Sequence, residues 1–171
     1  MTNNVHLCHV RAGLFLVIAG LLFGLFLGVS FGVNEDAYKQ YVSEGITANP
    51  EVHDAKSKDK IWRYAQRAHF HATGISACSL GLVILLALSN MRARLKSVSA
   101  LLIGLGNLYP LAWFSMYLLA PGIGREAAHE HILTEMLTYT SVTALLAGLL
   151  LLCANLFLGM LRETDTGGRS S

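Results

Sequence analysis

The chain has 171 residues, of which 53% are hydrophobic and 14% are charged, and its formal net charge is +2 at pH 7. This length and composition fit one domain and exclude a separate soluble domain beside the apolar segments. The basic residues are scattered along the chain and are not gathered on one face with aromatic residues between them, so a nucleic-acid partner is not expected.

Four apolar stretches predict four transmembrane helices. Each reaches the length of about 20 residues that a bilayer core requires, and the uncharged runs cover residues 12–33, 68–90, 97–124 and 136–161. We therefore predict an all-α integral membrane protein, a four-helix bundle in the lipid bilayer. Its spans are expected at about residues 11–33, 62–90, 97–120 and 129–161.

The first span carries a regular stripe of glycines. They recur at every fourth position: Gly20, Gly24, Gly28 and Gly32. Such spacing lets another helix approach closely in lipid, so we predict a packing face inside the bundle or between subunits. A cleaved signal peptide is disfavoured because the apolar run is too long, only Arg11 flanks it, and residues 30–32 form no A-x-A site. The segment is therefore interpreted as a retained helix.

Polar segments separate and follow the spans. Residues 34–61 are rich in Lys, Asp and Glu and predict a surface loop, with Pro50 as its strong breaker and a short helix near residues 36–42. The Pro-Gly-Ile-Gly sequence at residues 121–124 predicts the end of the third span, and the fourth helix is expected to begin near Arg125. The tail at residues 163–171 is short, polar and predicted to be disordered.

The number of spans sets the expected topology. An even number places both termini on one side together with the basic turn at residues 91–96, and places the polar loop on the other side. The dense basic turn favours cytoplasmic termini, in a multi-pass protein of the cell inner membrane. The odd number of cysteines, Cys8, Cys78 and Cys153, implies no disulfide framework.

Four histidines lie at the rims of the spans in two His-x-His pairs: His69 and His71, and His129 and His131. Residues two apart on a helix point about 200° apart, so at most one member of each pair faces a given interior. His69 shares its face with Gln66, Thr73 and Ser76, which favours it over His71. The same reasoning favours His129 in the fourth helix.

The third span aligns Asn107, Phe114 and Tyr117 on one face, so the three faces are expected to converge on a polar, aromatic-lined cavity. Imidazole suits haem iron, copper, zinc and non-haem iron alike. Haem in a helical bundle requires one axial histidine, or two from facing helices, within a largely apolar pocket. A carboxylate-bridged di-iron centre is disfavoured because the other spans contain no Glu.

Two short motifs carry a resemblance to a known family. They are Arg67-Ala68-His69 at the start of the second span and Ala93-Arg94-Leu95 before the third. Together with four spans and a long first loop, they make the chain resemble styrene oxide isomerase. The resemblance implies haem b with His69 as axial ligand, a homo-oligomer that is a trimer, and ferric iron acting as a Lewis acid on an epoxide that isomerises to an aldehyde.

The chain departs from that family at several positions. His71 stands where the family has Gly, residues 75–76 read Ile-Ser in place of Asn-Gly, and the third span has no acidic residue. In the enzyme interpretation, Tyr117 and Asn107 position the oxygen of a small hydrophobic substrate. The side chains expected around the haem are His69, His71, Arg67, Thr73 and His129.

Three other interpretations stay open. If His129 or His131 supplies a second axial ligand, the protein is a bis-histidine b-type cytochrome or a subunit of a respiratory complex. If the rim histidines and Glu126 bind copper or zinc, it is a metal-handling membrane protein. The histidines can also belong to a solvated charge belt at the membrane surface with Arg67 and Glu130, although polar groups within membrane spans are costly and usually functional.

Overall fold

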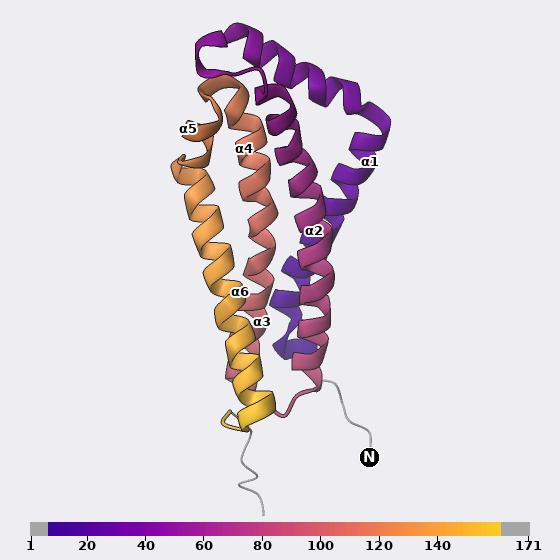
Figure 1. Cartoon of the computed structure of the whole chain (residues 1–171). Helices are drawn as coiled ribbons and strands as arrows, with labels where there is room; N and C mark the ends of the chain where they lie inside the picture. The colour runs from indigo at the N-terminus through magenta and orange to yellow at the C-terminus, as the bar shows by residue number, and fades with distance from the viewer. Residues whose placement is uncertain (1–6, 162–171) are drawn as a thin grey trace, which may run out of the picture.

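The computed structural model describes residues 7–161, and it confirms the all-α four-helix bundle (Figure 1). Within this range there are helices and no strand. The α-helices are α1 (Arg11–Ala48), α2 (Ser57–Leu88), α3 (Ala93–Leu105), α4 (Tyr109–Ile123), α5 (Arg125–His129) and α6 (Ile132–Leu158). Short 3-10 helices are η1 (Leu7–His9), η2 (Pro50–Val52) and η3 (Gly106–Leu108). The predicted tail at residues 163–171 lies outside the described residues.

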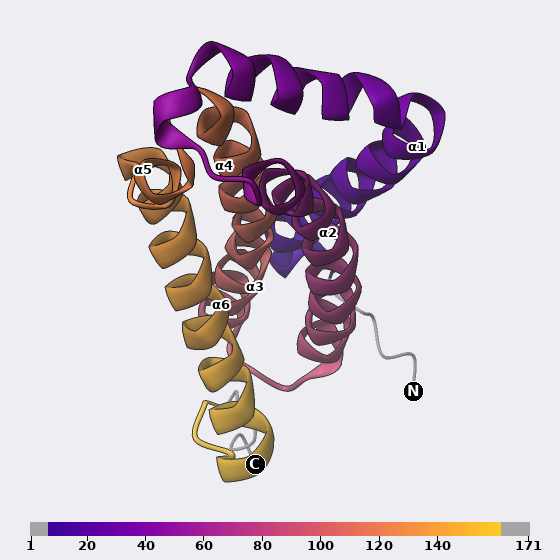
Figure 2. The same cartoon turned by 45° about the horizontal axis from the view of Figure 1, so that its top comes forward.

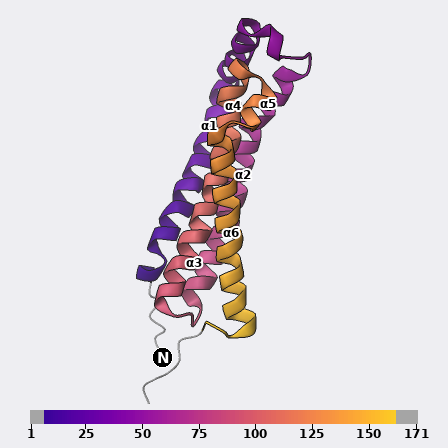
Figure 3. The same ribbon diagram turned by 90° about the vertical axis from the view of Figure 1, so that its left-hand side faces the viewer.

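Four helical segments are long and apolar enough to cross a membrane, so the chain is a multi-pass membrane protein. The third of them, Ala93–Ile123, is built from α3, η3 and α4 in succession. Residue 7 and the end of α6 lie at the same end of the bundle as the α2–α3 turn (Figure 1). α5 and the second part of α1 lie at the opposite end (Figure 3).

The polar segment after the first span is largely helical, where the sequence predicted a surface loop at residues 34–61 with only a short helix near residues 36–42. α1 continues to Ala48 across a kink at Asn34, whose φ of −142° and ψ of 39° are not helical. The part after the kink crosses the end of the bundle (Figure 2). It has one buried apolar side chain, Val42, and its other residues are half-buried or exposed. The polar residues of this segment therefore form the solvent-exposed face of a surface helix.

Hydrogen bonds tie this surface helix and the following turn to α4. The Tyr41 hydroxyl donates to the Leu118 carbonyl at 2.7 Å, and the Tyr117 hydroxyl donates to the Tyr38 carbonyl at 3.0 Å. His53 Nε2 donates to the Pro121 carbonyl at 3.0 Å. Pro121 lies inside α4, which ends at Ile123, within the Pro-Gly-Ile-Gly sequence that predicted the end of the span. The following Gly124 has a φ of +84°, which suits glycine.

α2 begins at Ser57, five residues before the predicted start at 62. A local turn starts it, since the Ser57 hydroxyl donates to Asp54 Oδ1 at 2.8 Å. Arg125 of α5 contacts the same carboxylate at 3.0 Å. These contacts lower the pKa of the Asp54 carboxyl below its usual range, the Ser57 hydrogen bond being the largest cause.

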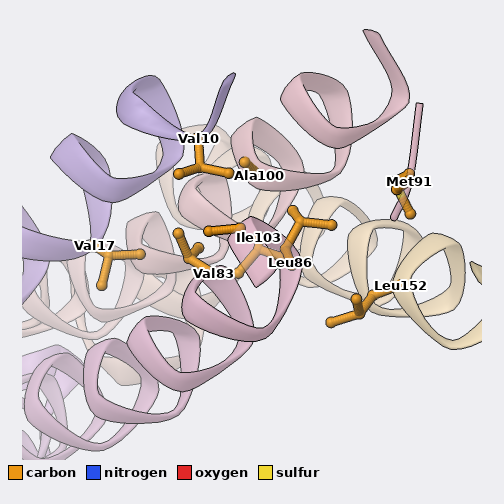
Figure 4. Packing of buried hydrophobic residues seen from close by; sticks show 9 residues of the cluster. Val10, Val17, Val83, Leu86, Met91, Ala100, Ile103 and Leu152 are labelled. Carbon is orange, nitrogen blue, oxygen red and sulfur yellow. The ribbon is translucent and has the colours of Figure 1, made fainter. Parts of the chain in front are cut away.

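The predicted basic turn closes the other end of α2. Lys96 is buried, and its Nζ donates to the carbonyls of Ser89 at 2.7 Å and Ala87 at 3.3 Å. An ammonium group at the C-terminus of a helix satisfies carbonyls that have no partner in the helix and interacts favourably with the helix dipole. Beneath this turn, side chains from α1, α2, α3 and α6 form an apolar core that includes Val17, Val83, Ile103 and Leu152 (Figure 4).

Three of the four stripe glycines pack inside the bundle. A Cβ at Gly20 would lie 2.7 Å from Ser76 Oγ, one at Gly24 2.8 Å from Thr73 Cγ2, and one at Gly28 2.7 Å from His69 Cε1. Real Cβ atoms do not approach other atoms so closely, so the absence of side chains lets α1 and α2 meet. No atom lies within 4 Å of the corresponding position at Gly32.

Candidate functional site

His69 lies half-buried on α2, with its ring against α1. Its Nδ1 is 2.8 Å from the carbonyl oxygen of Gly24. A carbonyl only accepts hydrogen bonds, so Nδ1 carries a proton, and in the neutral ring Nε2 then holds the lone pair. None of the hydrogen bonds formed among residues 7–161 involves Nε2. The ring is therefore fixed in the tautomer that can bind a metal through Nε2.

Gly28 sets the distance between the ring and α1. A Cβ at this position would lie 2.7 Å from Cε1, 3.2 Å from Nδ1 and 3.4 Å from Nε2 of His69. At Gly24 the same addition would meet the backbone N of Thr73 at 2.9 Å. The glycine stripe thus brings a backbone carbonyl of α1 within hydrogen-bonding distance of a histidine on α2.

The imidazole of His69 lines a groove between α1 and α2, with a volume of about 330 Å³. We call it the His69 groove. Its other lining residues are Gly28, Phe31, Gly32, Glu35, Trp62, Gln66 and Phe70. Phe31 lies edge-on to Trp62, with ring centroids 5.2 Å apart, and Phe70 is exposed on the outer surface of the bundle. The groove therefore combines aromatic walls with the polar side chains of Glu35, Gln66 and His69.

His71 and Arg67 lie elsewhere, although both were expected around the cofactor. The His71 ring stacks on Trp113 of α4, with centroids 5.6 Å apart, and the Arg67 guanidinium lies 4.8 Å from the centroid of the same indole. His71 Nδ1 donates to the Arg67 carbonyl at 2.8 Å. The cause is the helical twist, which points residues 67 and 71 about 200° away from residue 69.

Thr73 stays next to the histidine but outside the His69 groove. Its hydroxyl donates to the carbonyls of His69 at 3.1 Å and Phe70 at 3.2 Å within α2. Its methyl group and backbone face Gly24. Thr73 therefore helps to set the contact between α1 and α2 that holds His69.

Asn107 and Tyr117 were expected to position a substrate, and the structure places neither in the His69 groove. Asn107 is buried, accepts from the Ser76 hydroxyl at 2.7 Å and donates to the Gly104 carbonyl at 3.1 Å. Tyr117 is also buried, and its hydroxyl is bound to the Tyr38 carbonyl. Both polar groups are thus used to hold helices together, which the face alignment in the third span could not reveal.

The second histidine pair lies on the other side of the bundle. His129 is exposed at the end of α5 and lines two pockets, neither of which includes His69. His131 is the N-cap of α6, where its Nδ1 accepts from the Leu133 N–H at 3.3 Å. Within one chain, the structure does not bring His69 together with His129 or His131 in one cavity.

Residues 7–161 contain no cluster of three or more His, Cys, Asp or Glu side chains with the spacing of a metal site. A single histidine is enough for one axial bond to haem iron, because the macrocycle supplies the other ligands. The donor set of the described chain therefore suits a one-histidine haem better than a copper or zinc centre bound by several side chains.

The sequence identified His69 and Gln66 on one face but missed the partners from α1 and the aromatic walls. Trp62 and Phe31 are the aromatic lining residues that face each other across this groove's helices, α2 and α1. The glycine stripe was the available signal, since Gly24 and Gly28 are the residues that meet the segment around His69. Comparison of the chain with protein-family models, curated proteins and solved structures gives no match.

Proposed function

We propose that this protein binds haem b through His69 and acts as an epoxide isomerase of the styrene oxide isomerase type. The observation that carries the proposal is the hydrogen bond from His69 Nδ1 to the Gly24 carbonyl. Metal-binding histidines almost always donate their second ring N–H to a carbonyl or carboxylate, which fixes the tautomer and raises the basicity of the ligating nitrogen. His69 has this arrangement with the Gly24 carbonyl.

The walls of the His69 groove suit a macrocycle. Phe31, Trp62 and Phe70 offer apolar and aromatic surface, and glycines on α1 leave space beside the imidazole. An apolar pocket around one axial histidine is what haem requires in a helical bundle. The polar side chains among the lining residues are Glu35, Gln66 and His69 itself.

Bound ferric haem would supply a Lewis acid that polarises the epoxide oxygen. The residues of the chain would hold His69 in one orientation, exclude water with the aromatic walls and bind the apolar part of a small hydrophobic substrate. Because Asn107 and Tyr117 are engaged in other bonds, Gln66 takes their expected place as the neutral polar group beside the substrate oxygen.

The open side of the groove supports an oligomer. Phe70 is 64% exposed there, so a macrocycle held by His69 needs lipid or a neighbouring subunit to cover it. We infer a homo-oligomer, a trimer by resemblance, in the cell inner membrane with cytoplasmic termini. A bis-histidine cytochrome would need its second ligand from another subunit, because His129 of the same chain lies in different pockets.

An absorption spectrum of protein purified from haem-replete cells, oxidised and reduced, tests the proposal together with a pyridine haemochrome assay. We expect a haem b spectrum with high-spin ferric iron and conversion of styrene oxide to the aldehyde. His69→Ala should abolish the Soret band, and His71→Ala is the matched control that should keep it, because its ring faces Trp113. A colourless protein, or haem retained by His69→Ala, would overturn the proposal, and a low-spin spectrum would favour the cytochrome.

A further inference from the structure

A second cavity lies on the opposite side of α2 from the His69 groove, where α4 meets the start of α6. Its volume is about 110 Å³, and Tyr109, Trp113, Met116, His129, Glu135 and Tyr139 are among its lining residues. We call it the Trp113 pocket. It shares no residue with the His69 groove, so an inference about it does not depend on haem.

Several polar groups of the Trp113 pocket have no partner in the protein. The indole N–H of Trp113 is shielded from solvent and has no acceptor within hydrogen-bonding distance. Three other polar side chains line the pocket: Glu135 is half-buried, and His129 and Tyr139 are exposed. None of the three takes part in a hydrogen bond or ion pair within residues 7–161. An unsatisfied buried donor is unfavourable, and convergent free polar groups in an apolar pocket are typical of a binding site.

The indole of Trp113 is held in place by its neighbours on α2. Arg67 lies 4.8 Å from its centroid, His71 stacks on it with an interplanar angle of 27°, and Tyr64 lies 5.8 Å away. These contacts leave the ring little freedom to turn its N–H toward another acceptor. The position of the ring at the wall of the pocket is therefore fixed by the protein itself.

The charges around the pocket select the kind of ligand. The Glu135 carboxyl group disfavours an anion, and Arg67 on the Trp113 ring disfavours an ammonium ion that would use the same aromatic surface. A hydroxyl group can accept from the indole N–H and donate to a carboxylate at once. Ala112 and Met116 provide apolar surface for the rest of the molecule.

We propose that the Trp113 pocket binds a small neutral molecule through its hydroxyl group, as a second ligand site of this protein. Trp113 Nε1–H donates to the hydroxyl oxygen, and the Glu135 carboxylate accepts a hydrogen bond from the hydroxyl group. An apolar cavity of about 150 Å³ accommodates benzene. The smaller and partly open Trp113 pocket therefore suits a short alcohol or a phenol ring whose edge reaches the outside.

Titration of the protein with phenol, followed by NMR of its indole N–H groups in phosphatidylcholine nanodiscs, tests this site. The chain has two tryptophans, and Trp62→Phe assigns the remaining signal to Trp113. We expect a saturable downfield shift of the Trp113 N–H. Toluene has a similar ring without the hydroxyl group and should bind at least about tenfold more weakly, because it leaves the donor and the acceptor unpaired.

Glu135→Gln should weaken phenol binding about tenfold by weakening the acceptor. Glu130→Gln is the matched control, since this glutamate is exposed at the same end of the bundle and does not line the pocket. Equal thermal unfolding of the two variants excludes a folding defect. The proposal is overturned if phenol gives no saturable shift, if toluene binds equally well, or if tetramethylammonium shifts the signal in place of phenol.

Discussion

The contact between Gly28 and His69 yields the sharpest prediction about the site. In Gly28→Ala the new Cβ would lie 2.7 Å from His69 Cε1, so the ring has to move. The ring is anchored by its 2.8 Å bond to the Gly24 carbonyl, and displacement lengthens or breaks that bond. Gly28, one turn after Gly24 on α1, thus controls the orientation of His69, the proposed axial ligand.

Gly28→Ala is expected to change the free energy of unfolding little and to lower the affinity for haem much more. Replacing Gly by Ala inside a helix gains up to about 1 kcal/mol, and loss of one hydrogen bond costs about 0.5–1.5 kcal/mol. The free energy of unfolding of the apoprotein should therefore change little. Removal of the group that orients a metal-binding histidine typically lowers cofactor affinity about 10- to 100-fold, so haem affinity should fall by that factor.

Haem titration of the apoprotein, followed at the Soret band, measures the affinity, and thermal unfolding in detergent measures the stability. Gly74→Ala is the matched control, because Gly74 is exposed on α2 and a Cβ there meets no atom within 4 Å. It should keep the affinity of the parent protein. Equal affinities in the two variants would refute the role of Gly28.

Three further predictions concern the ends of the bundle. Lys96→Met should destabilise the protein by about 1–3 kcal/mol in thermal unfolding, because it leaves the Ser89 and Ala87 carbonyls without their donor; an unchanged melting temperature would contradict this. Tyr117→Phe removes the bond to the Tyr38 carbonyl and should raise hydrogen exchange in residues 35–48 while leaving α6 unchanged. The lowered pKa of Asp54 means that its folded value lies below the unfolded value of about 3.9. Its stabilising contribution is therefore present above that unfolded pKa and is lost as pH falls through the folded one. The hydrogen-exchange protection factors of residues 50–57, which are corrected for the intrinsic rate at each pH, should therefore fall in acid, and Asp54→Asn should show the lowered protection already at neutral pH.

The four spans could be predicted from the sequence because uncharged apolar runs of about 20 residues are typical of transmembrane helices and not of helices in soluble proteins. The surface helix after Asn34 was predicted only in part, as a short helix near residues 36–42, since its few inward residues, such as Val42, are outnumbered by polar ones. Its position also depends on bonds to Tyr117 and Pro121, which are distant in sequence. A helix held mainly by tertiary contacts leaves a weak pattern in its own residues.

The candidate site was predicted in part. Helical geometry separated His69 from His71, and the structure places the two rings against different helices, α1 and α4. Periodicity gives the angle between two side chains but not the helix that each one meets. For that reason the expected convergence with Asn107 and Tyr117 is absent from the His69 groove, whereas Gln66, on the same face as His69, lines it.

The surface helix across the end of the bundle also determines how the His69 groove can be reached. This second part of α1 is tied to α4 through the hydrogen bonds of Tyr41 and Tyr117. Glu35, at its start, lines the groove. Lifting it to admit a molecule from the aqueous side would break several bonds at once, whereas the outer side beside Phe70 is already open. A molecule can therefore reach the groove of a single chain from its outer side without moving the surface helix, so a neighbouring subunit that covered Phe70 would also control access to His69.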